Sequence, residues 1–203
     1  MWKFPLQIPA NRKVLVTQGY KSKELQDFYA SQGLKIDQHN AIDVVCGTNR
    51  ETYGTPVVCP FPKATILRSH FGTAVGSTND NNNFIQIGYT EGATRYEVGV
   101  LHLSEIVEKP VGYVFKEGEE MAYLGNAGTI TPAPTIGNPY AGAHAHISFF
   151  INGIVQDPLQ FLNITNPFIG PDSSWFKDLP PIRWAIAEAQ KAIDKLKSKP
   201  VDN

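Results

Sequence analysis

The sequence predicts a mainly β protein built on an antiparallel sheet. Asn152-Gly153 lies between the mostly apolar run 147–151 and the apolar pair Ile154-Val155. An Asn-Gly pair favours a two-residue hairpin turn, because both central residues of that turn need positive φ. Residues 84–89 alternate in polarity, as a half-buried strand does. The chain also contains 17 glycines and 15 prolines, long polar loops and a single long segment with helical periodicity. Together these features favour strands over helices.

The sequence predicts a series of short strands with few helices. We expect strands at 13–16, 43–46, 57–59, 63–68, 84–89, 96–103, 114–118, 121–125 and from 144 to the Asn-Gly turn. A short helix is expected over 23–32, ended by Gly33, and a short helix or turn over 159–162. The segments 69–83 and 129–142 are predicted to be long loops, and loops of this length are usually functional or mobile.

Composition and charge exclude several classes of function. The chain has 203 residues, a formal net charge of −1 and 42% hydrophobic residues, values that suit an ordinary globular protein. The charge gives no reason to expect a nucleic acid or an anionic membrane as partner. No secretory signal and no membrane-spanning stretch is visible.

Composition divides the chain near residue 163. Residues 1–162 hold the predicted strands, whereas 163–203 begin irregularly and then carry an amphipathic helix at about 182–197. Its apolar stripe consists of Ile182, Ile186, Ala189, Ile193 and Leu196. We therefore expect a main domain over 1–162 and a C-terminal extension over 163–203, whose helix docks on its own domain or mediates dimerisation.

The two cysteines, Cys46 and Cys59, follow similar Val-Val pairs. Neighbouring strands would allow a disulfide between them. Burial as two small apolar side chains is at least as good an interpretation, and their spacing does not suit a zinc site.

The histidines suggest a metal centre. His144 and His146 are two residues apart on a predicted strand, so both project from one face. His39 and Asp43 are four apart, a spacing that brings them together on a helix or a strand. Catalytic zinc takes three His or carboxylate ligands and leaves one position for water. His39, Asp43 and one imidazole of the pair would supply that set, while the other imidazole and His102 would act as general base or as oxyanion donors.

Several of these motifs occur in an order typical of a known family. They are His39-Asn-Ala-Ile-Asp43, Gly54-Thr-Pro-Val57, Leu101-His-Leu103, Gly125-x-x-Gly128, Gly142-Ala-His144-Ala-His146, Asn152-Gly153 and Asp157-Pro158. Over residues 13–162 this set resembles the lysostaphin-type (LytM-like) zinc endopeptidases, which cut peptidoglycan peptides.

The resemblance implies the roles of five residues. Zn²⁺ would be held by His39, Asp43 and His146, while His102 and His144 would assist the water and stabilise the tetrahedral intermediate. It implies an antiparallel sheet of the duplicated-hybrid-motif type, with a groove walled by the loops 69–83 and 129–142.

Three further positions bear on the substrate. Tyr140, just before the predicted site strand, is a candidate for substrate contact. His70 lies in a polar loop and is expected to be solvated. Ser148 stands where the family frequently has Glu, a departure that bears on substrate preference and removes no ligand.

The resulting hypothesis is a zinc-dependent endopeptidase acting on peptide stems or cross-bridges of bacterial peptidoglycan. The alternatives are a non-catalytic peptidoglycan-binding or hydrolase-activating module on the same fold, and a zinc peptidase with a non-wall substrate. The expected place of action is the cell wall, outside the cell or in the periplasm. Delivery by a phage or a non-standard export route would compensate for the missing signal peptide.

Overall fold

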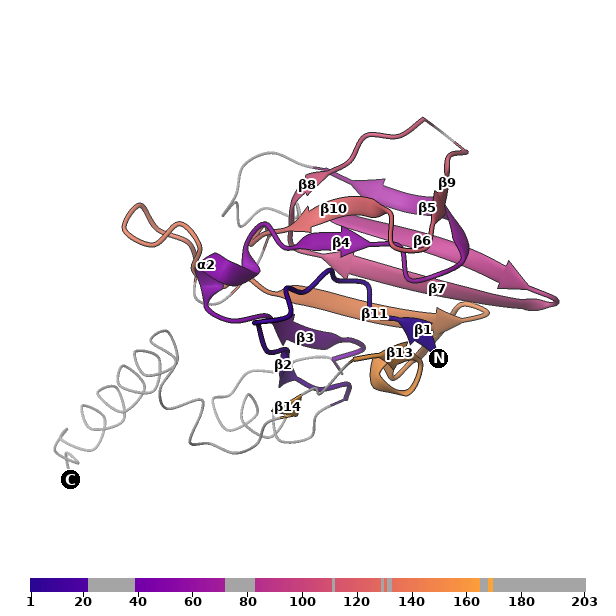
Figure 1. The fold of residues 1–203 in the computed structure, drawn as a ribbon, viewed down its shortest axis with the longest axis horizontal. Helices are drawn as coiled ribbons and strands as arrows, with labels where there is room; N and C mark the ends of the chain where they lie inside the picture. Colours follow the sequence, from indigo (N-terminus) through magenta and orange to yellow (C-terminus); the bar gives the residue numbers. More distant parts are fainter. Residues whose placement is uncertain are drawn as a thin grey trace, which may run out of the picture. The chain divides into compact units, whose positions relative to one another are not determined.

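The structure is a computed structural model, and it describes residues 1–21, 39–71, 83–110, 112–128, 130, 133–164 and, by backbone alone, 168–169. Residues Met1–Ile169 form one compact unit. The described part is mainly β with antiparallel sheets (Figure 1), which confirms the predicted fold class. No helix within it is long and apolar enough to cross a membrane.

A nine-stranded sheet dominates the described residues. Its spatial order is β14 (Phe168–Ile169), β2 (Leu15–Gln18), β3 (Ile42–Val45), β11 (Ala145–Ile151), β7 (Thr94–Leu101), β6 (Phe84–Glu91), β5 (Lys63–His70) and β9 (Val114–Lys116), and β12 (Ile154–Gln156) pairs with β11. All neighbours are antiparallel except β14 and β2, which are parallel.

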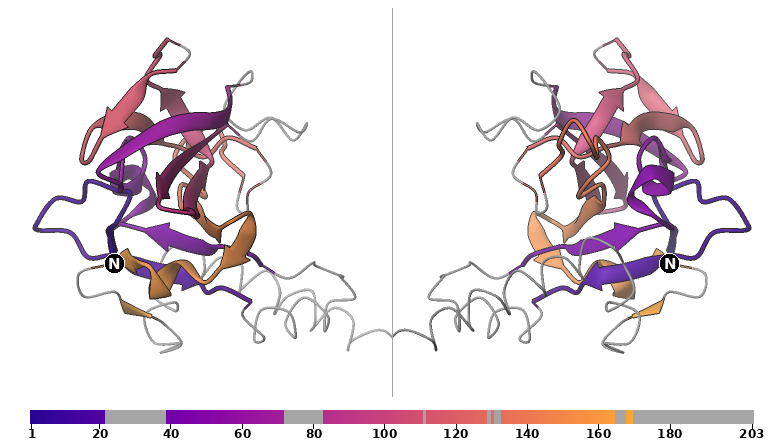
Figure 2. Two further views of the ribbon diagram at one scale, coloured as in Figure 1. Left: turned by 90° about the vertical axis from the view of Figure 1, so that its right-hand side faces the viewer. Right: turned by 90° about the vertical axis from the view of Figure 1, so that its left-hand side faces the viewer.

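A smaller antiparallel sheet packs on one face of the large one (Figure 2). It consists of β4 (Pro56–Val58), β10 (Glu120–Leu124) and β8 (Leu103–Ile106). The terminal strands β1 (Trp2–Lys3) and β13 (Leu162–Asn163) form a parallel pair. Two short helices complete the described elements, α2 (Asn49–Thr52) and the 3₁₀ helix η1 (Pro158–Gln160).

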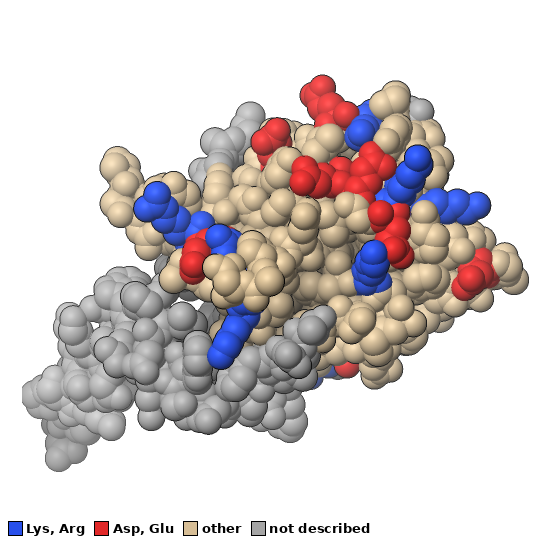
Figure 3. Space-filling model, viewed as in Figure 1, with Lys and Arg blue, Asp and Glu red and all other residues tan. Residues whose placement is uncertain are grey.

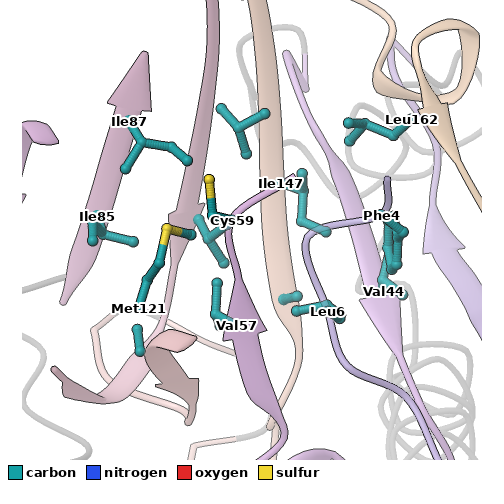
Figure 4. Packing of buried hydrophobic residues seen from close by; sticks show 14 of the residues in the cluster. Phe4, Leu6, Val44, Val57, Cys59, Ile85, Ile87, Met121, Ile147 and Leu162 are labelled. Atoms are coloured by element: carbon teal, nitrogen blue, oxygen red, sulfur yellow. The ribbon is translucent and has the colours of Figure 1, made fainter. Parts of the chain in front are cut away.

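The hydrophobic core lies between the two sheets. Ile85, Ile87 and Ile147 of the large sheet face Val57 and Met121 of the small one (Figure 4). Each of these side chains is at most 1% exposed, and burial of an aliphatic side chain of this size contributes about 1.5–3 kcal/mol. The core therefore holds the two layers in a defined register.

Strand β11 connects the core to the opposite face of the large sheet, which we call the outer face. Its alternate residues Ala145, Ile147 and Phe149 are fully buried in the core. His146 lies between them in sequence and projects from the outer face, because successive side chains of a strand point to opposite sides. In register, His146 pairs with Asp43 of β3, so both side chains share the outer face.

The Asn-Gly turn after β11 has the predicted geometry. Asn152 and Gly153 have φ of 50° and 78°, as a two-residue hairpin turn requires. The Asn152 N–H donates to Arg95 O, and its Oδ1 accepts from the Arg95 N–H, each at 2.8 Å. The turn is thereby tied to the neighbouring hairpin.

Helix α2 was not predicted, although its start is visible in the sequence. The Thr48 N–H donates to Glu51 Oε2 at 2.8 Å, and the Glu51 N–H donates to Thr48 Oγ1 at 3.3 Å. This reciprocal pair is a capping box, which stabilises a first helical turn.

Other expectations differ from the structure or fall outside it. Strand β5 continues through His70, so the prediction of a loop from residue 69 is wrong at its start. Strand β11 begins at Ala145, so His144 directly precedes the strand on which it was predicted. Strand β7 ends at Leu101, which makes the prediction of one strand over 96–103 wrong at His102. The helices predicted over 23–32 and 182–197 lie outside the described residues, and the domain boundary at 162 stays a prediction.

Charges of both signs mix on the face shown in Figure 3. Lys109 Nζ lies 3.2 Å from Glu119 Oε1, and Lys3 Nζ lies 2.7 Å from Glu117 Oε1. Exposed pairs of this kind contribute little to stability, but they balance the local charge.

Candidate metal centre

Three side chains from two segments that are distant in sequence meet on the outer face. His39 Nε2 lies 3.3 Å from Asp43 Oδ1 and 3.3 Å from His146 Nδ1, and His146 Nδ1 lies 3.0 Å from Asp43 Oδ1. The three atoms form a nearly equilateral triangle. They are a group of His and carboxylate ligands that could hold a metal ion.

The size of this triangle fits zinc. Zinc binds histidine nitrogen and carboxylate oxygen at about 2.0–2.2 Å, and tetrahedral angles then separate two ligand atoms by about 3.3–3.5 Å. The observed separations of 3.0–3.3 Å are close to that range. Three ligands would leave the fourth tetrahedral position for water, so the residues present fit a catalytic zinc site.

The β3–β11 register supplies two of the ligands, and a backbone carbonyl orients the third. His39 precedes β3, and its Nδ1–H donates to Gly19 O at 3.1 Å. This hydrogen bond fixes the ring so that Nε2 faces Asp43 and His146. Metal-binding histidines commonly donate their second nitrogen to a carbonyl in this way.

The electrostatics of the cluster favour an ionised carboxylate. Burial acts to raise the pKa of Asp43, but hydrogen bonds from His146 and His39 outweigh it and hold that pKa well below its usual range. Burial acts to lower the pKa of His39, but the hydrogen bond and charge of Asp43 raise it overall. The Asp43 carboxylate is therefore ionised at neutral pH.

Two more imidazoles border the triangle. His144 Nε2 lies 3.7 Å from Asp43 Oδ1, and its Nδ1–H donates to Gly142 O at 2.7 Å. The ring centroid of His102 lies 4.5 Å from that of His144 and 5.9 Å from that of His146. The side chains of His144 and His146 are 19% and 24% exposed, so solvent reaches this edge of the cluster.

His102 reaches the cluster through an unusual backbone conformation. Its φ is +64°, a left-handed value that costs a non-glycine residue roughly 1–2 kcal/mol. Asn83 fixes Leu103, the residue that follows His102. The Asn83 carbonyl accepts the Leu103 N–H at 3.1 Å, and Asn83 Nδ2 donates to Leu103 O at 2.9 Å. If β7 continued regularly, residue 102 would share the core face with Val100.

The buried position keeps His102 neutral. Burial, followed by the charge of nearby His144, lowers the pKa of His102 to about 4. Its Nδ1–H donates to Ala127 O at 2.8 Å, so the remaining nitrogen, Nε2, carries the lone pair. At neutral pH His102 is thus a proton acceptor.

The remaining candidates lie elsewhere. Tyr140 packs its ring edge-on to Tyr53, with a centroid distance of 5.2 Å, and Arg50 Cζ lies 5.8 Å from the Tyr140 centroid. These contacts place it beside α2, and its substrate role stays a prediction. His70 is exposed and stacks on Phe84, with a centroid distance of 6.3 Å. Neither belongs to the histidine cluster.

The cysteines form no disulfide. Cys46 and Cys59 are both free and buried, which agrees with the interpretation of two small core side chains. Burial raises the pKa of the Cys59 thiol to about 11.

Sequence reasoning missed the groups that orient the histidines. Asn83 supports His102 from a position in the predicted loop, and Asn126 occupies a position that the motif Gly125-x-x-Gly128 leaves unspecified. The carbonyls of Gly19, Ala127 and Gly142 leave no signature in a sequence, because every residue has one.

Comparisons with known proteins show similarity of fold. No known protein family and no curated protein matches the sequence. A zinc-containing peptidase from Vibrio cholerae superposes with a TM-score of 0.52 at 19% identity, covering 77% of this chain and 39% of that one. A chain of the SpoIIQ–SpoIIIAH pore-forming complex superposes with a TM-score of 0.53 at 14% identity, covering 87% and 96%.

The antimicrobial peptidase lysostaphin from Staphylococcus simulans also matches, with a TM-score of 0.49 at 22% identity, covering 79% of this chain and 55% of that one. The chain thus spans well under two thirds of the length of both peptidases. At these identities the similarity concerns the fold.

Proposed function

We propose that this chain is a zinc-dependent endopeptidase of the lysostaphin type, which hydrolyses peptide bonds in the stems or cross-bridges of bacterial peptidoglycan. The observation that carries the proposal is the triangle of His39, Asp43 and His146, closed to zinc-ligand spacing and bordered by two further imidazoles. A scaffold protein that only binds has no need of ligands at this spacing.

His39, Asp43 and His146 would hold the ion. When bound, zinc would lower the pKa of a coordinated water to about 7 and polarise the scissile carbonyl. Asp43 contributes a negative charge to the site, and the carbonyl of Gly19 keeps His39 in the tautomer that presents Nε2.

The two bordering histidines would move the protons. His102 is neutral at pH 7 and presents Nε2 as an acceptor, so it would take a proton from the attacking water and pass it to the leaving amine. His144 Nε2 faces Asp43, where in its protonated form it would donate a hydrogen bond to the developing oxyanion.

The non-catalytic alternative rests on fold alone. A chain of a pore-forming complex has this fold as readily as a peptidase does, and fold does not determine function. The presence of a complete ligand triangle favours the enzyme. Action at the cell wall, by whatever route the protein reaches it, is part of the same proposal.

The experiment combines metal analysis with digestion of purified sacculi from several wall types, followed by mass analysis of the fragments. The wild-type chain should contain about one equivalent of zinc and release peptide fragments, and His146→Ala should lose both. His70→Ala is the matched control, because His70 is exposed and outside the cluster. A full equivalent of zinc in His146→Ala would refute the ligand set.

The fragments also decide the substrate. Zinc binding without cleavage of any wall preparation would refute the wall substrate. Cleavage of an unrelated peptide by such a sample would then support a zinc peptidase with a different substrate.

A further inference from the structure

Asn126 is a fully buried polar residue that joins two loops beside the metal centre. It is 0% exposed, and its Nδ2 donates to Pro139 O and to Ala141 O, each at 2.9 Å. Because both neighbours are carbonyl oxygens, the amide must present its NH₂ group to them. Asn126 therefore ties the loop 125–128 to the loop 139–142.

The loop 125–128 is itself fixed to the small sheet. A Cβ on Gly125 would lie 2.5 Å from Ser104 N, so the backbone of the two segments is in direct contact at a position that only glycine fits. Ser104 Oγ donates to Leu124 O at 2.9 Å. Asn126 thus projects from a rigid support.

Each of the two loops holds one of the bordering histidines. Ala127, the next residue after Asn126, accepts the Nδ1–H of His102 at 2.8 Å. Gly142, the next residue after Ala141, accepts the Nδ1–H of His144 at 2.7 Å. The two carbonyls that orient the imidazoles are therefore each one residue away from an end of the Asn126 bridge.

The carbonyls of Ala127 and Gly142 also determine the tautomers of His102 and His144. A neutral imidazole carries its proton on one nitrogen, and the partner of that nitrogen decides which one it is. With Nδ1–H donated to a carbonyl, the neutral form of each ring has no proton on Nε2. In His144 this nitrogen lies 3.7 Å from Asp43 Oδ1. If either carbonyl moved by an ångström, the ring would lose this constraint.

The Asn126 side chain is held by its NH₂ group and not by its oxygen. Asn126 Oδ1 is buried and has no hydrogen-bond partner among the described residues. An unsatisfied buried acceptor costs about 1–3 kcal/mol. The amide is held in place by what its two N–H groups do.

We infer that Asn126 is a positioning residue that locks His102 and His144 in the Nδ1–H tautomer through one bridge between their supporting loops. The effect of Asn126 on the two tautomers follows from the structure alone, whereas its effect on turnover rests on the proposed function. In the described structure Asn126 makes no hydrogen bond to His39, Asp43 or His146, so its loss should affect proton transfer and spare metal binding.

The test compares Asn126→Asp and Asn126→Ala with the wild type, all zinc-loaded. Asn126→Asp keeps the shape but replaces the donating NH₂ group with an acceptor, and Asn126→Ala removes the group in case a buried carboxylate prevents folding. Asn138→Asp and Asn138→Ala are matched controls, since Asn138 is exposed in the same loop and uses only its backbone there.

Three quantities are measured: bound zinc, imidazole tautomers by long-range ¹H–¹⁵N correlation, and kcat with KM on wall fragments. We expect the zinc content to be unchanged and His102 and His144 to shift toward the Nε2–H tautomer. We expect kcat to fall by about 10–100-fold, the loss found when groups supporting a metal site are removed. KM should stay within about threefold of the wild-type value. The Asn138 variants should match the wild type.

The outcomes separate this inference from the proposed function. Wild-type tautomers in a folded Asn126 variant would overturn it, whatever the activity. Loss of zinc in both variants would overturn it as well, because Asn126 would then support the ligands. Shifted tautomers in a protein that hydrolyses nothing would support the bridge while refuting the peptidase.

Discussion

Asp43 and His146 lie directly opposite each other in the β3–β11 register, and Asp43 Oδ1 lies 3.0 Å from His146 Nδ1. Residues opposite each other on antiparallel strands have Cβ atoms about 4.5–5.5 Å apart. Two short side chains at that distance can converge on one ion without straining the backbone. The sheet itself therefore sets the spacing of two ligands.

Replacing Asp43 with Asn should weaken zinc binding at least about 100-fold while keeping the fold. The substitution preserves shape but removes the negative charge that the hydrogen bonds of His146 and His39 keep ionised, and zinc is bound by the ionised carboxylate. Competition with a chelator measures the change. Asp157→Asn is the control, since Asp157 only caps η1, a role Asn fulfils equally well. Equal zinc affinity in both variants would contradict the ligand assignment.

Replacing His102 with Gln should leave the zinc content unchanged and lower kcat by about 10²–10⁴-fold. His102 borders the ligand triangle without belonging to it, and general acid–base catalysis contributes about that factor. Metal analysis and turnover of wall fragments are measured on one preparation, with His70→Gln as control. A kcat within threefold of the wild type would show that His102 moves no proton.

Replacing Gly153 with Ala should destabilise the protein by about 1–2 kcal/mol, because φ is 78° at this position and a Cβ is disfavoured in that conformation. Denaturant unfolding measures the difference. Gly137→Ala is a suitable control, since an added Cβ meets nothing within 4 Å and φ is not left-handed there. Kinetic constants should not change, because the turn lies at the far end of β11 from His146. Equal stability of the two variants would argue against the observed turn.

Both thiols should resist labelling in the folded protein at pH 8. Burial raises the pKa of Cys59 to about 11, so roughly one molecule in a thousand carries the reactive thiolate at that pH, and Cys46 is fully buried. A thiol reagent should modify both residues only after denaturation, and Cys59→Ala assigns the signals. Raising the pH to 9 increases the Cys59 thiolate tenfold but leaves it a small minority. Rapid labelling of the native protein would contradict the packing of Cys59.

Local sequence patterns were sufficient for the β architecture around the site. Asn152-Gly153 predicted its turn because positive φ depends on the residues themselves. Strand alternation predicted that His144 and His146 project into one space, since a strand repeats every two residues, and both imidazoles lie near Asp43. The two cysteines, by contrast, allowed either a disulfide or burial, and only the structure shows that both are free.

His102 marks where local reasoning fails. The alternation of side chains along β7 would place His102 in the core. A left-handed backbone conformation at His102 instead places its ring beside the candidate metal centre. The bend depends on Asn83, which is distant in sequence and grips Leu103 by two hydrogen bonds. A periodic pattern cannot anticipate a conformation imposed by a remote backbone contact.

The sequence by itself determined the strands, the turn and the kinds of side chain available to bind a metal, because these depend on periodicity and residue chemistry over a few positions. Only the tertiary structure decided that His39 and His146, 107 positions apart, approach to 3.3 Å, and that backbone carbonyls and Asn126 orient the neighbouring rings. Convergence of this kind depends on strand register and loop anchoring, which arise when distant segments pack together.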